Sequence, residues 1–176
     1  MKANVFVEKI QELKPNLDDF KNVEVSEELI NDWTKEFDVR QISFKKYDTE
    51  ILTLLSTYDL SNLRINDITF DPNYQEDSEY IYFGYDINDR LVLNKHNGKI
   101  FSYDGFEGRI VYKCAENEEM FLDALYEISK FSKEKMTNHY PEEIRDQKSI
   151  KVAYIAALKA GGEEYEDYYK SVLWIE

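Results

Sequence analysis

Cysteine, proline and glycine are scarce in this sequence, and long apolar runs are absent from it. The single cysteine, Cys114, excludes a disulfide within the chain and suits a reducing compartment. Residues 1–16 (MKANVFVEKIQELKPN) lack the unbroken apolar stretch of a secretion signal, because Glu8 and Glu12 interrupt it. No apolar run approaches the ~20 residues that a transmembrane helix needs. We therefore expect a cytoplasmic protein without a membrane partner.

Motifs of common active sites are missing as well. The sequence contains neither G-x-G-x-x-G nor G-x-x-x-x-G-K-[ST], the glycine loops that hold phosphate groups. No local pattern brings its two histidines, His96 and His139, together. Cys114 follows the apolar residues of IVYKCA, so we expect a buried, unreactive thiol; a deep pocket holding Cys114 and a histidine would instead indicate a nucleophile. We expect no enzymatic activity and no cofactor.

One short segment resembles the start of a calcium-binding loop. Asp86, Asn88 and Asp89 provide the oxygen ligands, but the sixth position is Leu91, where such a loop needs glycine. We therefore predict a polar β-turn at these residues, and we expect no metal ion.

Negative charge dominates the composition. The chain has 36 aspartates and glutamates against 22 lysines and arginines, and its net charge is −14. Such a surface repels nucleic acid and anionic membranes, and it speeds the association of basic partners. Acidity can also serve solubility alone. If the negative charge serves binding, we expect the partner to be a basic protein, and we expect that nucleic acid does not bind directly.

The spacing of apolar residues changes twice along the chain. Helical spacing predicts helices over residues 3–14, after Ser26 and after Asp48. Between residues 60 and 115 the period falls to about two, which indicates strands. Helical spacing returns at Asn117. The sequence therefore predicts an α+β fold, with a single domain over residues 1–176 in which a central antiparallel β-meander (60–115) is flanked by N-terminal (3–58) and C-terminal (117–175) helices.

Several local features are predicted in more detail. Asn97-Gly98 lies between two apolar segments and predicts a hairpin with a two-residue type I′ turn. A second turn is predicted at residues 71–73, and a strand over residues 63–70 is expected to bend near Asn66. The buried stripe of the helix after Pro141 is expected to consist of Ile150, Tyr154, Ile155 and Leu158.

Two segments interleave acids with tyrosines. Residues 71–80 (DPNYQEDSEY) and 161–170 (GGEEYEDYYK) each contain four acids, with two and three tyrosines respectively. Tyrosine gives large contact area and acidic charge steers association, so both suit a binding face; in the alternative, the rings pack inward and the acids are simply solvated. We expect a protein-binding surface at Asp71, Tyr74, Glu76, Asp77, Glu79, Tyr80, Tyr85, Asp86, Asp104 and Glu107.

Three segments in the second half of the chain match the pattern of one known family. Residues 80–104 (YIYFGYDINDRLVLNKHNGKIFSYD) give a strand ending in Phe-Gly, a polar turn, an apolar strand and an Asn-Gly turn. Residues 121–131 (FLDALYEISKF) match the helix that follows the sheet, and residues 155–173 (IAALKAGGEEYEDYYKSVL) match an alanine-rich helix, a Gly-Gly turn and an aromatic last helix. Together they resemble the SUKH superfamily, typified by the yeast Smi1/Knr4 proteins. Residues 39–59 depart from it, because they lack the Leu-Pro and Asn-Gly-Gly patterns of many members.

This resemblance implies a function. Many bacterial members of the superfamily are immunity proteins, so the chain would bind a cognate bacterial toxin domain and neutralise it without catalysis. Many such toxins are nucleases, whose basic surfaces a chain of net charge −14 would complement. The alternative, implied by the eukaryotic relatives, is a general scaffold or regulatory domain that binds other proteins.

Overall fold

The N-terminal part of the chain is helical, as the apolar spacing predicts. The computed structural model describes residues 1–87 and 89–175. Two of its helices begin at side-chain caps: Ser26 Oγ accepts from the Leu29 amide at 3.3 Å, and Thr49 Oγ1 accepts from the Leu52 amide at 3.2 Å. The elements before the main sheet are α1 (Ala3–Leu13), the 3-10 helix η1 (Leu17–Phe20), α2 (Glu27–Lys35), β1 (Arg40–Gln41), α3 (Glu50–Thr57) and β2 (Tyr58–Asp59).

The middle of the chain forms the predicted antiparallel meander. Each strand pairs with the next one in sequence, so the order in the sheet is β3-β4-β5-β6-β7. The strands are β3 (Ile68–Glu76), β4 (Tyr80–Asp86), β5 (Asp89–Asn94), β6 (Ile100–Asp104) and β7 (Arg109–Ala115). After them come α4 (Glu118–Thr137), α5 (Glu142–Ala160), the 3-10 helix η2 (Glu163–Tyr165) and α6 (Glu166–Val172). The α+β class with its central meander is therefore confirmed.

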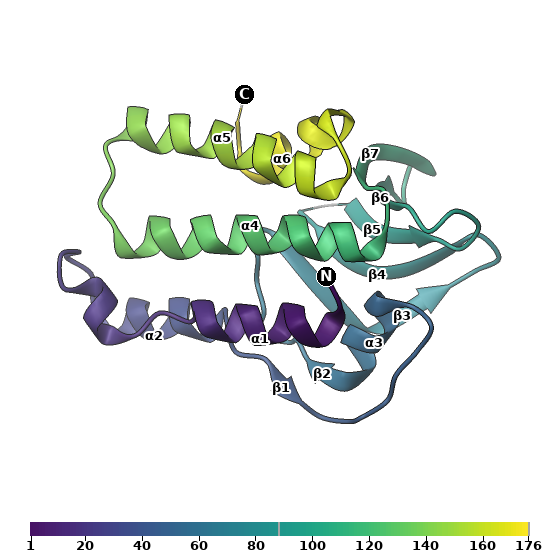
Figure 1. The fold of residues 1–176 in the computed structure, drawn as a ribbon, viewed down its shortest axis with the longest axis horizontal. Coiled ribbons are helices and arrows are strands. Elements are labelled where there is room, and N and C mark those ends of the chain that lie inside the picture. The colour runs from purple at the N-terminus through teal and green to yellow at the C-terminus, as the bar shows by residue number, and fades with distance from the viewer. Residues whose placement is uncertain (88, 176) are drawn as a thin grey trace.

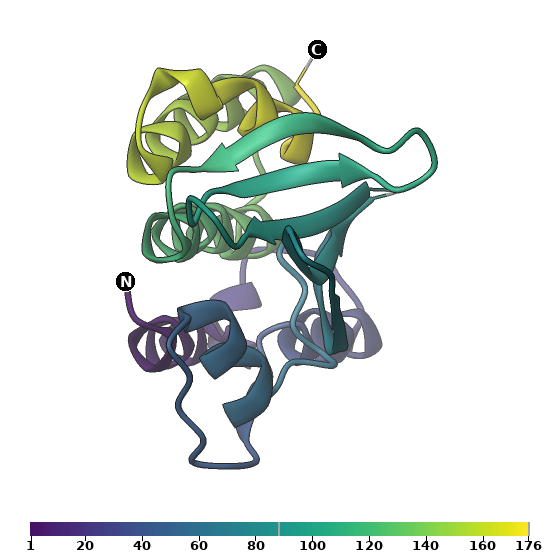
Figure 2. The ribbon, with the colours of Figure 1, turned by 90° about the vertical axis from the view of Figure 1, so that its right-hand side faces the viewer.

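The helices lie to one side of the sheet. In Figure 1, α5, α4 and α1 run one above another, and the sheet stands at their ends on the right. Figure 2 looks at the sheet from that right-hand side, and no helix lies in front of β5, β6 and β7. One face of these strands is therefore covered by helices, and the opposite face, the outer face, is not.

Aromatic rings connect the covered face of the sheet to the helices. Phe83 of β4 and Phe121 of α4 are both fully buried, and their ring centroids lie 5.9 Å apart at an interplanar angle of 76°. Phe70 of β3 stacks on Phe83 at 6.4 Å. An edge-to-face pair of this kind stabilises beyond the burial of its area. The core therefore runs from β3 and β4 into the long helix α4.

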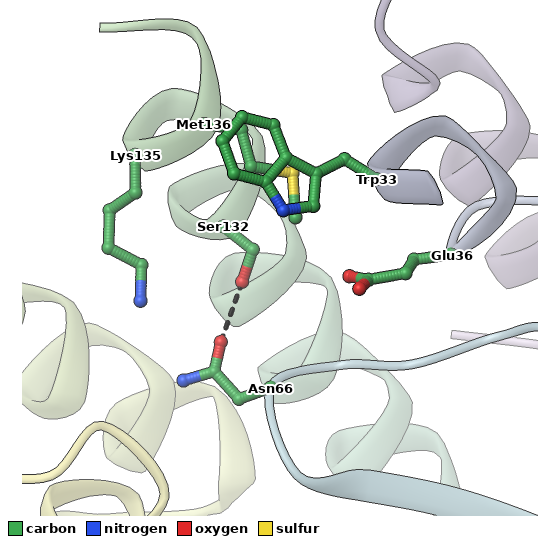
Figure 3. Close-up of a pocket in the computed structure, with 6 residues that line it drawn as sticks. All are labelled: Trp33, Glu36, Asn66, Ser132, Lys135 and Met136. Atoms are coloured by element: carbon green, nitrogen blue, oxygen red, sulfur yellow. Dashed lines mark hydrogen bonds between the residues drawn. The ribbon is translucent and has the colours of Figure 1, made fainter. Parts of the chain in front are cut away.

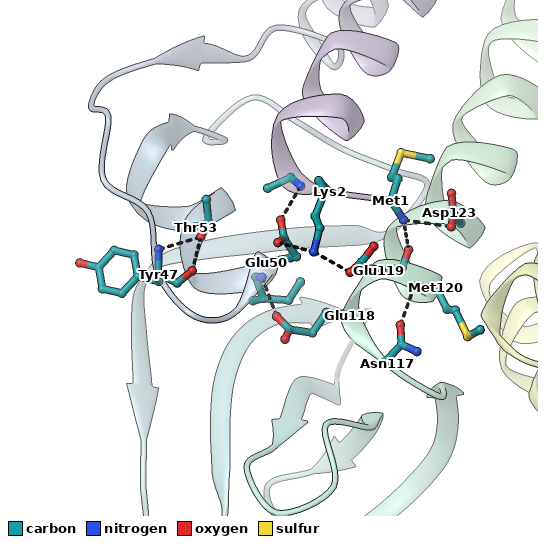
Figure 4. A network of polar contacts seen from close by, with 12 residues as sticks. Met1, Lys2, Tyr47, Glu50, Thr53, Asn117, Glu118, Glu119, Met120 and Asp123 are labelled. Carbon is teal, nitrogen blue, oxygen red and sulfur yellow. Dashed lines mark hydrogen bonds and ion pairs between the residues drawn. The ribbon is translucent and has the colours of Figure 1, made fainter.

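A second contact between elements is polar and joins three helix starts (Figure 4). The Glu118 carboxylate of α4 accepts from the Ile51 amide of α3 at 2.7 Å, and Glu50 of α3 accepts from the Ala3 amide of α1 at 2.8 Å. Lys2 pairs with Glu50 at 3.2 Å. Each carboxylate thus satisfies an amide that its neighbouring helix leaves free, which fixes α1, α3 and α4 relative to one another.

Two of the predicted turns differ from the structure. The hairpin after β5 exists, but five residues (95–99) separate its strands: the Gly98 amide donates to the Asn94 carbonyl at 2.9 Å, and only Gly98, not Asn97, has a positive φ. The type I′ prediction is therefore wrong. Residues 71–73 lie within β3, where the pairing with β4 shifts register between Phe70 and Gln75. The predicted turn is an irregularity inside one strand, and its proline interrupts the ladder without ending it.

The predicted strand over residues 63–70 begins later than expected. Asn66 has a φ of 52°, and Ile65 and Ile68 form a single bridge across it, so the bend is a tight reversal and the strand starts at Ile68. Asparagine tolerates this left-handed conformation better than most residues. The Asn66 amide donates to the Val172 carbonyl at 3.0 Å, which attaches the reversal to α6.

The buried side of α5 is not the predicted one. Three of the four predicted residues, Ile150, Tyr154 and Leu158, are 49%, 40% and 49% exposed, and Ile155 is half-buried. Small residues face the core in their place, namely Ser149, Ala153, Ala156, Ala157 and Ala160. Alanine allows close approach of backbones, so α5 packs against α4 and α6 through its smallest side chains. The apolar stripe of α5 is left on the surface.

The tyrosines of residues 161–170 pack inward, which is the alternative to a binding face in that segment. Tyr165, Tyr168 and Tyr169 are all buried. The Tyr169 hydroxyl donates to the Cys114 carbonyl at 2.8 Å, and the Tyr165 hydroxyl donates to Glu116 at 2.6 Å. These two bonds join the last helices to the end of β7, so this segment serves the fold.

Candidate functional site on the outer face of the sheet

The outer face of the sheet carries two rows of paired side chains. In the first row, Tyr85 lies opposite Arg90, Arg90 opposite Tyr103, and Tyr103 opposite Ile110, across four strands. In the parallel row, Tyr82 pairs with Val92, Val92 with Phe101, and Phe101 with Lys113. Because side chains alternate between the faces of a strand, this arrangement follows directly from the register. Aromatic residues therefore gather where no helix covers the sheet.

The rings on this face contact one another. The centroid of Tyr103 lies 5.7 Å from that of Tyr80 and 6.1 Å from that of Tyr82, and Tyr80 and Tyr82 are 6.2 Å apart. Val92 and Phe101 are 0% and 8% exposed although they lie outside the main core. The side chains around them therefore shield a small apolar layer. We call Tyr80, Tyr82, Tyr85, Arg90 and Tyr103 the tyrosine face.

Arg90 lies at the centre of the tyrosine face. Its guanidinium carbon is 4.9 Å from the centroid of Tyr85 and 5.2 Å from that of Tyr82. The Nε and Nη2 atoms are buried, yet they have no hydrogen-bond partner among the described residues. A buried donor without an acceptor costs roughly 1–3 kcal/mol, and more when it is charged. The face therefore holds a cation with two enclosed donors, which an external oxygen acceptor would stabilise only if the rings over them move.

The hydroxyls of Tyr80 and Tyr82 stay protonated. Burial, together with the hydrogen bond to the Asp77 carboxylate, raises the pKa of Tyr82 to about 12. Burial and then the Glu79 carboxylate raise the pKa of Tyr80 as well. Both groups are therefore neutral hydroxyls, which suits contact with another protein and gives no basis for their acting as a base.

A tight acidic turn borders one end of this face. The Asp77 carboxylate accepts from the Glu79 amide at 2.7 Å, the Tyr80 amide at 2.8 Å and the Tyr82 hydroxyl at 2.8 Å. These bonds to the charged form, the Tyr80 amide first, lower the pKa of Asp77. Lys95 pairs with Glu76 at 2.6 Å. The turn is therefore rigid, and Asp77 acts chiefly within the chain.

The opposite end of the sheet has a similar turn with an exposed ring. Asp104 accepts from the amides of Phe106 and Glu107, at 2.8 and 3.0 Å, and these bonds lower its pKa. Phe106 is fully exposed at the tip of the loop, and Glu107 pairs with Arg109. A fixed turn that presents an apolar ring to solvent is a natural anchor for a partner.

The ten predicted surface residues do not form one patch. Successive turns of a meander lie at alternate ends, so Asp77 and Glu79 are separated from Asp104 and Glu107 by the length of the strands. Tyr80 and Tyr85 connect the two ends through the outer face. Three predicted residues behave differently: Tyr74 is half-buried against the core, Asp71 accepts from the Asn73 amide within β3, and Asp86 is only 5% exposed.

Sequence reasoning missed the residues that unite this face: Tyr82, Arg90, Tyr103 and Phe106. Strict alternation along β4 gives Tyr80 and Tyr82 the same face, but their neighbours on β5 and β6 follow only from the register. Phe106 did carry a signal, because a large apolar residue between Asp104-Gly105 and Glu107-Gly108 cannot be buried by a turn. Asp86, in contrast, points into the molecule and is not accessible to a partner.

Asp86 is a buried carboxyl group among other acids. Burial is the main cause that raises its pKa from 3.8 to about 6, and the charges of Asp89 and Asp67 add to the shift. The folded chain therefore holds the Asp86 proton more tightly than the unfolded chain does. Stability contributed by this group is present at low pH and is lost as the pH rises from 3.8 towards 6.

We expect Asp86→Asn to stabilise the protein by about 2 kcal/mol at neutral pH, because it removes an ionised group from a buried site. The gain should grow as the pH rises from 3.8 to about 6 and stay constant above that range. Urea unfolding of both proteins across this range measures it. Glu24→Gln removes one exposed charge and serves as the control. A gain that is equal at both ends of the range would contradict the shifted pKa.

The other candidates for a catalytic or metal-binding role have little structural support. Cys114 is fully buried, and burial raises the pKa of its thiol well above the usual range, so it is a poor nucleophile. Among the described residues, no three His, Cys, Asp or Glu side chains are placed to hold a metal ion. Asn88, part of the segment resembling a calcium loop, lies outside the described residues. No helix in residues 1–87 and 89–175 has the length and apolarity to cross a bilayer.

Comparison with known proteins identifies no relative of this chain. No protein-family model matches the chain, and no curated protein or solved structure is significantly similar to it. Its function must therefore be inferred from the side chains described above.

Proposed function

We propose that this chain is a non-catalytic, cytoplasmic protein-binding domain, and specifically an immunity protein that neutralises a cognate bacterial toxin domain with a basic surface. The observation that carries the proposal is the tyrosine face. It is an uncovered sheet surface with four tyrosines around an arginine whose Nε and Nη2 lack acceptors among the described residues. The resemblance of residues 80–173 to SUKH proteins supports the choice of partner.

The chemistry of the face suits a protein more than a small molecule. Tyrosine and arginine are enriched among the residues that dominate binding energy, and here they are held by one another before any partner arrives. A partner that displaces the rings over Arg90 and places a backbone carbonyl or a carboxylate there would satisfy its two buried nitrogens. The exposed ring of Phe106 extends the surface beyond the edge of the sheet.

Charge explains why the partner would be basic. The chain has a net charge of −14, and Glu79 and Glu107 lie at the two ends of the tyrosine face. A toxin that holds nucleic acid needs a basic surface, and this acidic surface can occupy it in place of the nucleic acid. Steering of this kind raises association rates above the ~10⁵–10⁶ M⁻¹s⁻¹ of an unsteered pair.

Growth protection tests the proposal. Candidate toxin domains encoded near this gene are expressed in bacteria with and without this chain, and each purified pair is analysed for stoichiometry. We expect one-to-one complexes, protection only when the chain is at least equimolar with the toxin, and association that slows as salt increases. Protection at a small fraction of the toxin concentration would indicate catalysis. A stable, active toxin in the presence of excess chain would contradict the proposal.

The second candidate function is a general scaffold of the Smi1/Knr4 type. The exposed stripe of α5, formed by Ile150, Tyr154 and Leu158, favours it because it offers a second surface away from the tyrosine face. A scaffold uses both surfaces, whereas an immunity protein of the proposed kind needs one. Substitution of the α5 stripe should therefore leave toxin neutralisation unchanged. Loss of neutralisation on changing only α5 would favour the scaffold.

A further inference from the structure

A pocket lies at a distance from the tyrosine face, between α2, the reversal at Asn66 and α4. Its volume is about 290 Å³, which suits a ligand of amino-acid size. It is open to solvent on one side. The residues that line it are Trp33, Glu36, Asn66, Ser132, Lys135 and Met136.

Two opposite charges face this pocket without meeting. In Figure 3, the Glu36 carboxylate and the Lys135 ammonium lie on opposite sides of the hydrogen bond between Ser132 and Asn66. Neither group forms an ion pair or a side-chain hydrogen bond with any described residue, and the Lys135 ammonium contacts only a ring face, 5.1 Å from the centroid of Phe131. Both side chains are half-buried. The pocket therefore contains one anion and one cation that form no ion pair with the part of the chain that the structure describes.

The surroundings of each charge support this description. Burial raises the pKa of Glu36, and the charge of Arg64 offsets only part of that effect. Burial also lowers the pKa of Lys135, with the charge of Arg145 acting in the same direction. Each group is thus shifted towards its neutral form. Both charges have lost water and have no ion-pair partner among the described residues. The Arg64 charge near Glu36, and the Phe131 ring and the Asp67 charge near Lys135, offset part of this cost, and an oppositely charged ligand group would recover more of it.

The rest of the pocket is fixed in place. Ser132 Oγ donates to Asn66 Oδ1 at 2.8 Å, and the Asn66 amide nitrogen donates to the Val172 carbonyl at 3.0 Å. Trp33 stacks on Phe20 with ring centroids 6.0 Å apart, which holds the indole over the opening. Figure 3 shows the indole and the Met136 side chain above the polar floor. The apolar wall and the polar floor between the two charges are therefore preorganised.

We propose that this pocket binds a small zwitterion of amino-acid size, with its ammonium on Glu36, its carboxylate on Lys135 and its apolar side chain against Trp33 and Met136. This arrangement places each ligand charge beside the protein charge that lacks a partner. It also uses both charges at once, so a ligand with only one of them recovers only part of the free energy. The site is independent of the tyrosine face and of any protein partner.

Tryptophan fluorescence and calorimetry test the proposal on the full chain. Trp174→Phe leaves Trp33 as the sole tryptophan, so its emission reports on the pocket. The standard amino acids are titrated first. For leucine, 3-methylbutan-1-amine lacks only the carboxylate and 4-methylpentanoate lacks only the ammonium; the equivalent pair is used for whichever amino acid binds best. We expect the zwitterion to bind at least about tenfold more tightly than either partial ligand.

Substitutions assign the two charges. Glu36→Gln and Lys135→Met should each weaken binding by about ten- to hundredfold, whereas Glu24→Gln, which changes one exposed acid elsewhere, should have no effect. No binding by any standard amino acid would overturn the proposal. So would equal affinity for the amine alone, or unchanged affinity in Glu36→Gln. Because no partner protein is needed, this result is separate from the outcome of the growth-protection experiment.

Discussion

Gly84→Ala should destabilise the protein by about 3 kcal/mol or prevent folding, because β4 passes too close to β3 for any side chain. A Cβ atom at this position would lie 2.4 Å from the carbonyl oxygen of Thr69, which is backbone and cannot rotate away. The pairing of β4 with β5 is irregular at the same place, between Tyr82 and Gly84. A strand shift here would move Phe83 out of the core, so the whole sheet resists the change.

A second glycine provides the matched control. Gly98 has a φ of +73°, but a Cβ atom there meets nothing within 4 Å. Gly98→Ala should therefore cost only the strain of a left-handed residue, about 1 kcal/mol. Urea unfolding of the two variants and the parent protein measures both effects. Equal destabilisation by the two substitutions would show that close approach at Thr69 is not the cause.

Loss of two rings from the tyrosine face should weaken binding of the proposed toxin partner by about a thousandfold, since two residues of this type commonly contribute roughly 2 kcal/mol each. The double variant is Tyr82→Ala with Tyr103→Ala, measured by calorimetry against the cognate toxin domain. The control is Tyr154→Ala with Leu158→Ala, which removes a similar apolar area from the exposed stripe of α5. Unchanged affinity in the first variant, with affinity lost in the second, would move the binding surface to α5.

A single substitution separates binding from stability on the same face. Tyr82 and Tyr103 shield Val92 and Phe101, so removing the two rings also lowers the stability of the free protein. Arg90→Met, in contrast, keeps the bulk of the side chain and removes two buried donors that lack acceptors among the described residues. Free-protein stability should therefore stay the same or rise. Affinity for the toxin should fall about tenfold or more, because a charge-assisted hydrogen bond is lost. Thermal unfolding and calorimetry on the same samples distinguish the two effects.

Local signals accounted for much of the fold. Ser26 and Asn117 cap helices where the sequence placed them, and a period of about two marked the meander, because backbone geometry alone sets these spacings. Predictions were wrong where the packing of several helices against one another decides which side chains are buried. On α5, hydrophobicity favoured Ile150 and Leu158 for the core, but the close approach of α4 and α6 left room only for alanines such as Ala156.

In the candidate site too, some features follow from the sequence alone and others only from tertiary packing. Acidic charge, the α+β class and the tyrosines of β4 were all determined by the sequence, because composition and alternation need no knowledge of neighbours. The union of Tyr82, Arg90 and Tyr103 was decided only by strand register, and the pocket between Glu36 and Lys135 only by how α2 packs near α4. Residues about a hundred positions apart meet through packing of the whole chain, and no local pattern encodes that meeting.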